Sequence, residues 1–169
     1  MSEPSRRDLA TIVKAYDIRG VVPDELNESL ARDIGAAFVR VVGATSVVTA
    51  YDMRESSPGL AQAFADGARS QGADVVEAGL GSTDLLYYAS GSLDMPGAMF
   101  TASHNPAKYN GIKLCRAGAA PVGQDSGLAE IRAMVEEGVP SYDGKPGSVI
   151  FAKDVSSRAY IQVASWRYR

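Results

Sequence analysis

The sequence predicts an α/β protein, a three-layer αβα sandwich around a mainly parallel mixed sheet. Short β-branched runs alternate with segments whose apolar residues repeat every three or four positions, the pattern of βαβ units with both sheet faces covered. The chain has 169 residues, 46% hydrophobic and 22% charged, which is ordinary for one globular domain. The single cysteine, Cys115, excludes a disulfide scaffold and is expected to pack as a small hydrophobic side chain.

Each expected element follows from a local pattern. Asn27 suits the N-cap of a helix whose apolar residues recur at spacings of four, four and three, on one face. The turn-rich segment 56–59 begins a second helix, and Gly72 ends it. The remaining helices are expected at 82–89 and 126–137. The expected strands are 11–16, 46–50, 73–78, 97–101 and 111–115, with a charged turn at 17–20 after the first.

The pattern also predicts how the chain is divided. Residues 1–10 are a polar leader, and residues 11–147 form the folded domain. The segment 138–147 is rich in Gly, Pro, Ser and Asp, which is typical of a loop that leaves a domain. Residues 148–169 are too few to build another core.

Charge and composition exclude several classes of function. Seventeen basic and twenty acidic residues give a net charge of −3, so the surface as a whole is not suited to nucleic acid. No apolar stretch approaches the roughly 20 residues of a membrane span, and the first residues do not resemble a signal peptide. We therefore expect a cytoplasmic protein with neither nucleic acid nor membrane as a partner. The only histidine, His104, excludes a zinc site built from several histidines.

Polar residues gather where three strands of the predicted sheet end, in segments 16–20, 52–57 and 101–113. Function in open α/β sheets collects at the carboxyl ends of the strands. In the third segment an apolar strand leads to Ser103, and Lys108 and Lys113 follow. A phosphate on this serine would add negative charge and three acceptor oxygens, which nearby cations and loop amides would stabilise. The pattern therefore predicts phosphoryl transfer, which depends mainly on positioning and charge stabilisation.

Two other chemistries fit these residues less well. Ser103 and His104 are adjacent, so in extended backbone their side chains point to opposite faces, and the flanking residues do not form a G-x-S-x-G elbow. This disfavours a serine hydrolase. The glycine-rich segment 79–83 lacks the spacing of both G-x-G-x-x-G and the P-loop, so no nucleotide site is expected there.

Two motifs resemble signatures of the α-D-phosphohexomutase family. Residues 101–106 read TASHNP and residues 110–113 read NGIK, which is similar to the family's phosphoserine loop. Residues 14–20 read KAYDIRG, which resembles its N-terminal signature. Order and spacing agree with the family, and the likeness is greatest to its bacterial phosphomannomutase/phosphoglucomutase members. The resemblance covers residues from about 11 to 150, the first of the family's four domains.

The resemblance implies a role for each matching residue. Ser103 would be the phosphoserine, and one oxygen of its phosphate would bind Mg²⁺. Lys113 would be the second catalytic residue, a cation beside the transferred group and a general acid or base. The substrate-binding residues would be Tyr16, Arg19, His104 and Asn105. The reaction would exchange mannose or glucose phosphates between their 1- and 6-isomers through a hexose 1,6-bisphosphate.

Asp52 and Arg54 lie in a turn that the family often shares, but the segment leading into it differs from the family pattern. We expect them to form a structural ion pair that braces the serine loop, and we assign them no catalytic role.

The sequence also departs from the family. The D-G-D-x-D motif that supplies the other metal ligands does not occur, and the later sugar-selecting and phosphate-gripping loops are missing. Residues 148–169 would then be a truncated start of the interdomain segment, from a frameshift or premature stop, and the chain would be an incomplete catalyst alone. Two alternatives stay open: a catalytically dead binding or interaction fragment, and a phosphoglucosamine mutase, which shares the serine loop. Sugar phosphates are the expected partners.

Overall fold

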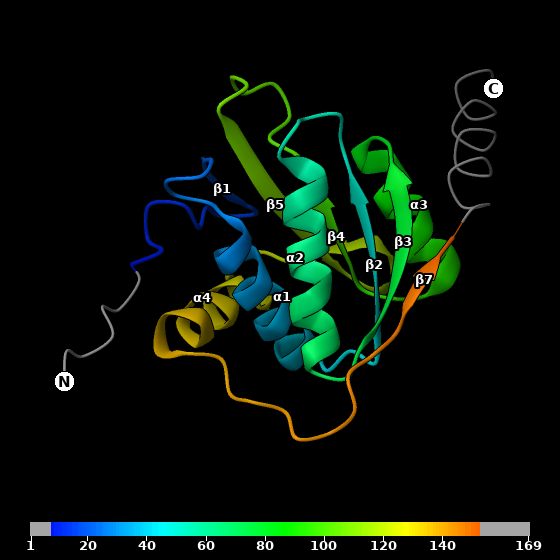
Figure 1. Cartoon of the computed structure of the whole chain (residues 1–169). Coiled ribbons are helices and arrows are strands. Elements are labelled where there is room, and N and C mark those ends of the chain that lie inside the picture. Colours follow the sequence, from blue (N-terminus) through cyan, green and yellow to red (C-terminus); the bar gives the residue numbers. More distant parts are fainter. Residues whose placement is uncertain (1–7, 153–169) are drawn as a thin grey trace, which may run out of the picture.

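The computed structural model describes residues 8–152, which form a central sheet with helices on both faces (Figure 1). The helices are α1 Glu28–Val42, α2 Ser57–Ser70, α3 Thr83–Leu93 and α4 Leu128–Glu137, with short 3₁₀ turns at Ala117–Ala119 and Gln124–Ser126. The strands are β1 Ile18–Val21, β2 Ser46–Tyr51, β3 Asp74–Leu80, β4 Gly97–Phe100, β5 Tyr109–Arg116, β6 Ala120–Pro121 and β7 Val149–Phe151.

The sheet has the order β1-β5-β4-β2-β3-β7, and β6 pairs with β5 outside this path. Strands β4, β2, β3 and β7 are mutually parallel, whereas β5 is antiparallel to β4, β1 and β6. This confirms the predicted α/β class. The antiparallel part is larger than the helix-strand alternation predicts, because β5 follows β4 without a helix between them.

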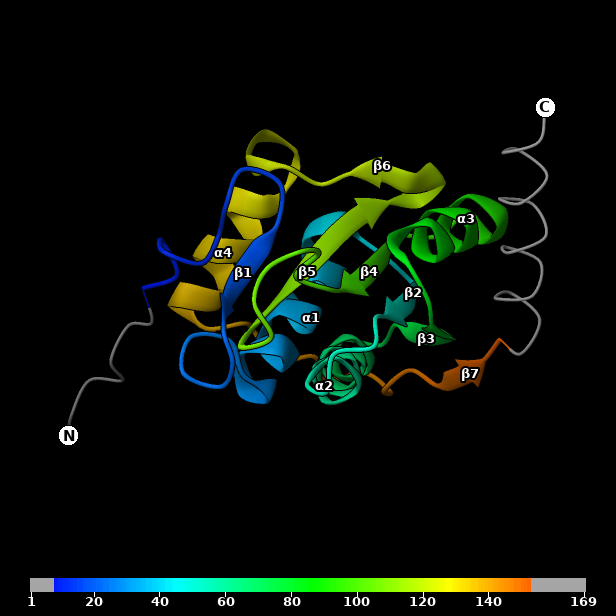
Figure 2. The ribbon, with the colours of Figure 1, turned by 90° about the horizontal axis from the view of Figure 1, so that it is seen from above.

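Alternation along the strands fills one core on each side of the sheet. Val47, Ala98 and Leu114 belong to the core under α1, α2 and α4, and their neighbours Val48 and Met99 belong to the core under α3. Figure 2 shows α3 on one side of the sheet, with α1 and α2 on the other. The three predicted layers are therefore present.

One row of apolar residues crosses β4, β5 and β1. Phe100 pairs with Ile112, Ile112 pairs with Ile18, and all three are buried under α1 and α2. The ring of Phe100 meets that of Phe64 edge to face, with centroids 5.4 Å apart. Phe100 is the last residue of β4, so this packing anchors the start of the loop that follows.

The first long helix begins and ends as predicted. The Asn27 side chain accepts a hydrogen bond from Leu30 N at 2.9 Å, and Gly43 ends α1 with a φ of 64°. Helices α1 and α2 approach so closely that a Cβ on Gly67 would lie 1.8 Å from the Arg32 carbonyl oxygen. Glycine at this position therefore allows the two helices to pack backbone against backbone.

The predictions for residues 11–20 were wrong. Residues 9–13 form a turn in which Ile12 and Val13 N–H groups donate to the Leu9 carbonyl, and only Val13 makes a β-bridge. The expected charged turn at 17–20 is instead largely strand β1. Leu9, Ile12 and Val13 are all buried and lie at the i, i+3 and i+4 spacing of a helical turn. Their burial outweighs the β-propensity of the segment.

The domain boundaries stay a prediction, although the described fold extends past both of them. Leu9 is buried in the core, and Val149–Phe151 adds β7 to the edge of β3. Most of the expected segment 148–169, and residues 1–7 of the expected leader, lie outside the described residues. Cys115 is fully buried on the α3 side, as predicted. Within residues 8–152 no helix is long and apolar enough to cross a membrane.

Candidate functional site

Ser103 stands on the loop that leaves the carboxyl end of β4 and leads into β5. The residue is exposed, and its φ of 53° is in the left-handed region that non-glycine residues rarely adopt. Its N–H donates to Thr101 Oγ1 at 3.0 Å. Between residues 8 and 152 no hydrogen bond engages the Ser103 hydroxyl, so this oxygen is open to an incoming group.

Arg54 holds the serine loop by its backbone. One guanidinium nitrogen donates to the carbonyls of Pro106 at 3.0 Å and Tyr109 at 2.9 Å. The other donates to the carbonyls of Ser103 at 3.0 Å and Asn105 at 2.7 Å. The predicted bracing role of this arginine is therefore confirmed.

A buried polar network fixes the base of the same loop. Asp52 accepts hydrogen bonds from Ser57 Oγ at 2.6 Å and Arg54 N at 3.0 Å, and one of its oxygens is 3.5 Å from Arg54 Nε. The fully buried Asn110 donates to Ser56 Oγ at 2.8 Å and Ser57 Oγ at 2.9 Å. The start of β5, the start of α2 and the Arg54 turn are thus joined by paired polar groups, as burial requires.

The sequence motifs did not predict the contribution of Asn110 and Ser57. The sequence carried one partial signal: Asn110 lies two residues before Ile112 and four before Leu114, so extending the strand alternation places Asn110 on the same buried face. Buried polar groups need partners, and Asn110, Ser56 and Ser57 supply them to one another.

Arg19 and Lys113 lie on the face of the sheet opposite α1 and α2. Each is next in sequence to a member of the buried apolar row, so its side chain points to the other face. Lys113 is paired with Met99, which belongs to the α3 core, and Arg19 is paired with Gly111. Figure 2 shows α3 displaced from β1, so α3 does not cover the strand that carries Arg19.

The two cations differ in their partners. Arg19 Nη2 is 2.5 Å from Asp17 Oδ2, so a carboxylate already offsets much of its charge, while its buried Nε has no hydrogen-bond partner among residues 8–152. Lys113 is half-buried, and within the part of the chain that the structure describes its side chain makes no ion pair or hydrogen bond. By the strand register Arg19, opposite Gly111, lies nearer the loop end of β5 than Lys113, but the charge of Lys113 is the less neutralised of the two.

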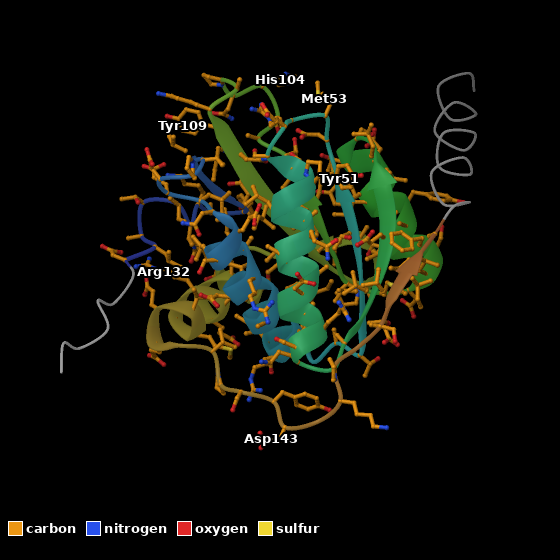
Figure 3. The ribbon with its side chains drawn as sticks, viewed as in Figure 1. Tyr51, Met53, His104, Tyr109, Arg132 and Asp143 are labelled. Atoms are coloured by element: carbon orange, nitrogen blue, oxygen red, sulfur yellow. The ribbon has the colours of Figure 1, made fainter. Side chains whose placement is uncertain are left out.

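The other predicted residues lie at different distances from the serine. His104 is exposed at the tip of the loop, near Met53 at the top of Figure 3. Asn105 uses its side-chain nitrogen internally, donating to the Ala102 carbonyl at 2.7 Å. Tyr16 is 75% exposed on the turn before β1, beside Gly123 and so beyond the far end of the β1–β5 ladder. The structure brings His104 and Asn105 to Ser103, and it places Tyr16 elsewhere on the surface.

The residues present do not make a complete Mg²⁺ site. Mg²⁺ takes six oxygen ligands in octahedral geometry. Across residues 8–152 no cluster of three or more Asp, Glu, His or Cys side chains could hold a metal ion. A phosphate on Ser103 would contribute one ligand, so no reaction step of this chain is assigned to the metal.

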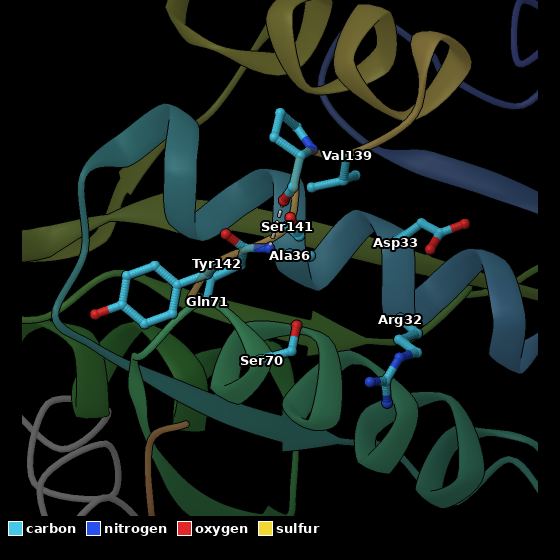
Figure 4. A pocket seen from close by; sticks show the side chains of 9 residues that line it. Arg32, Asp33, Ala36, Ser70, Gln71, Val139, Ser141 and Tyr142 are labelled. Carbon is cyan, nitrogen blue, oxygen red and sulfur yellow. Dashed lines mark hydrogen bonds between the residues drawn. The ribbon is translucent and has the colours of Figure 1, made fainter. Parts of the chain in front are cut away.

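The described part of the chain also contains two pockets. The larger pocket, of about 460 Å³, lies between the starts of α1 and α2. Glu28 and Glu55 line it, and their carboxylates would repel a phosphate. The other, of about 320 Å³, lies between α1, the end of α2 and the loop 139–142 (Figure 4), near the end of the molecule marked by Asp143 in Figure 3. Neither contains a residue of the serine loop.

Comparisons with known proteins agree with this architecture. A profile of the phosphoglucomutase/phosphomannomutase alpha/beta/alpha domain I matches residues 10–140. A protein named phosphohexose mutases from Xanthomonas campestris pv. campestris is 48% identical over 123 residues, which are 72% of this chain and 28% of that protein. A phosphomannomutase of Klebsiella pneumoniae is 42% identical over 128 residues, 75% of this chain and 82% of that sequence. The chain thus spans about 28% of the length of the Xanthomonas relative.

Solved structures show the same fold. A phosphoglucomutase/phosphomannomutase family protein from Burkholderia thailandensis superimposes with a TM-score of 0.77 at 33% identity, covering 88% of this chain and 34% of that one. A second structure, a putative phosphomannomutase from Thermus thermophilus, gives a TM-score of 0.76 at 28% identity and covers 91% of this chain and 35% of that one. These matches confirm the family resemblance on which the sequence motifs were interpreted.

Proposed function

Because the chain belongs to the phosphoglucomutase/phosphomannomutase domain I family, we propose that Ser103 is the phosphoryl carrier of a phosphohexomutase reaction. The observation that carries this proposal is the geometry of the loop. It presents the Ser103 hydroxyl, which has no partner among residues 8–152, at the carboxyl edge of the parallel strands, while Arg54 binds the backbone carbonyls of the loop. The proposed substrates are hexose phosphates, with mannose and glucose phosphates first because the relatives are named for those sugars.

The proposed step is transfer from a hexose 1,6-bisphosphate to the serine. A P–O bond forms to Ser103 Oγ as the P–O bond to a sugar oxygen breaks, and the proton of the serine hydroxyl ends on that sugar oxygen. We assign the proton transfer and part of the charge stabilisation to Lys113, whose ammonium has no partner within residues 8–152. His104 would contact the sugar phosphate, because it is exposed on the same loop.

The reverse step would pass the group from Ser103 to the free position of a second hexose monophosphate and regenerate a hexose 1,6-bisphosphate, so the two steps together convert one monophosphate isomer into the other. Mg²⁺, once bound by ligands beyond those described, would supply charge stabilisation at the phosphate. A longer protein would provide the remaining site, since the chain covers 28% of the Xanthomonas relative. We therefore propose that this chain alone accepts the phosphoryl group and completes the full exchange poorly.

The test is incorporation of phosphate from glucose 1,6-bisphosphate with Mg²⁺, followed by intact-mass spectrometry. We expect one phosphoryl group on the chain and none on Ser103→Ala. The matched control is Ser92→Ala, an exposed serine on α3 outside the loop, which should incorporate phosphate like the unaltered chain. Absence of phosphate from the unaltered chain would support instead the binding fragment without catalytic activity.

A further inference from the structure

We infer that Arg54 shapes a backbone anion site around the phosphate of Ser103, formed by the N–H groups of His104 and Ala107. This inference deepens the proposed function and rests on it for the identity of the anion. Arg54 is here a positioning residue, because it acts on the phosphate only through the loop backbone.

Two peptide groups of the serine loop are oriented by Arg54. The carbonyls of Ser103 and Pro106 both point at the Arg54 guanidinium, at 3.0 Å each. In a trans peptide the C=O and the following N–H point in opposite directions. The N–H groups of His104 and Ala107 therefore point away from Arg54, toward the outer side of the loop.

Both of these N–H donors are unpaired in the described loop. The neighbouring N–H groups of Asn105 and Tyr109 are used within the loop, donating to the carbonyls of Ala102 and Pro106. Over residues 8–152 the N–H groups of His104 and Ala107 have no hydrogen-bond acceptor. Unpaired backbone N–H groups on the outer side of a turn are donors for an anion, and a phosphoserine brings three acceptor oxygens to them.

The shape of the guanidinium makes arginine necessary at position 54. The guanidinium offers five N–H donors in a planar fork, and here four carbonyls and Asp52 surround it. A lysine ammonium offers three donors from one point and cannot reach four separated carbonyls. Arg54→Lys keeps the charge and loses the fork, so it separates loop geometry from electrostatics.

The experiment uses the full chain with phosphoserine installed at position 103 during translation, so that it does not depend on enzymatic labelling. Amide ¹H–¹⁵N NMR spectra of the phosphorylated and unmodified chains are compared. We expect the amide protons of His104 and Ala107 to move downfield and to exchange more slowly in the phosphorylated chain, because they donate to the phosphate. No such change in the unaltered protein overturns the anion site.

The variants then test Arg54. Both changes should be lost in Arg54→Lys. They should persist in Arg69→Lys, a control arginine that also bonds a backbone carbonyl and pairs with an aspartate, but far from the serine. Persistence in Arg54→Lys would overturn the positioning role. If glucose 1,6-bisphosphate never labels the chain, the proposed function fails, yet these spectra still decide the present inference.

Discussion

Removal of the Asn110 side chain should destabilise the protein more than its size suggests. Asn110→Ala deletes hydrogen bonds to Ser56 Oγ, Ser57 Oγ and Gly111 N, which measure 2.8, 2.9 and 2.8 Å. At about 1 kcal/mol for each bond, and somewhat more where a buried partner is left unpaired, the expected loss is about 3 kcal/mol. The Asn110 side chain is fully buried, so water cannot replace the missing amide without a rearrangement.

The assay is urea unfolding followed by far-UV circular dichroism, with the midpoint and the slope both fitted. Asn27→Ala provides the scale, because it removes a single N-cap bond and should cost about 1 kcal/mol. We expect Asn110→Ala to lose at least twice as much with an unchanged slope. A loss no larger than that of Asn27→Ala would refute the view that the buried network fixes the base of the loop.

Two further perturbations follow from the packing and charges. Gly67→Ala gains about 1 kcal/mol of helix propensity, but its Cβ would lie 1.8 Å from the Arg32 carbonyl oxygen, so we expect a net loss of about 2 kcal/mol in the free energy of unfolding. Gly91→Ala on α3 has open space around the new Cβ and should stabilise the protein by up to about 1 kcal/mol. Thermal unfolding of both variants checks this, and a stable Gly67→Ala would contradict the close helix contact. Hydrogen bonds from the Arg132 side chain and from a backbone N–H lower the pKa of Glu136 in the folded protein. The ionised carboxylate therefore stabilises the fold at pH values above the pKa of Glu136 in the unfolded chain. This stabilisation is lost as the pH falls through the lower pKa of the folded protein. Glu136→Gln should therefore be less stable than the unaltered chain at neutral pH and equal to it in acid, as urea unfolding along a pH series will show; a constant difference would disprove the linkage.

The regular elements could be predicted because their signals are local. The Asn27 cap, the apolar spacing of α1, and the β-branched run of β2 each determine their own structure within a few residues. The prediction for residues 11–20 was wrong because their structure depends on contacts that are distant in the sequence. Ile12 and Val13 have high β-propensity, but burial against the core beside Leu9 selected a turn, and β1 formed where its edge could pair with β5.

The site was predictable in part. Ser103 and the bracing Arg54 follow from motif and chain order, because both lie at strand ends that the fold brings together. The hydrogen bonds of Asn110 and the ion pair of Arg19 with Asp17 depend on side-chain geometry across elements, which no single-sequence pattern encodes. The distance of Tyr16 from the loop follows from the strand register, which also had to be seen in the structure.

The most direct test of the central claim asks whether the fold makes Ser103 reactive. The chain is exposed to glucose 1,6-bisphosphate and Mg²⁺ once in buffer and once unfolded in urea, and peptides are then fragmented to locate each phosphate. The account predicts phosphate at residue 103 in the folded chain and at no serine in the unfolded one. Phosphate spread over several exposed serines, or equal labelling of the unfolded chain, would contradict it.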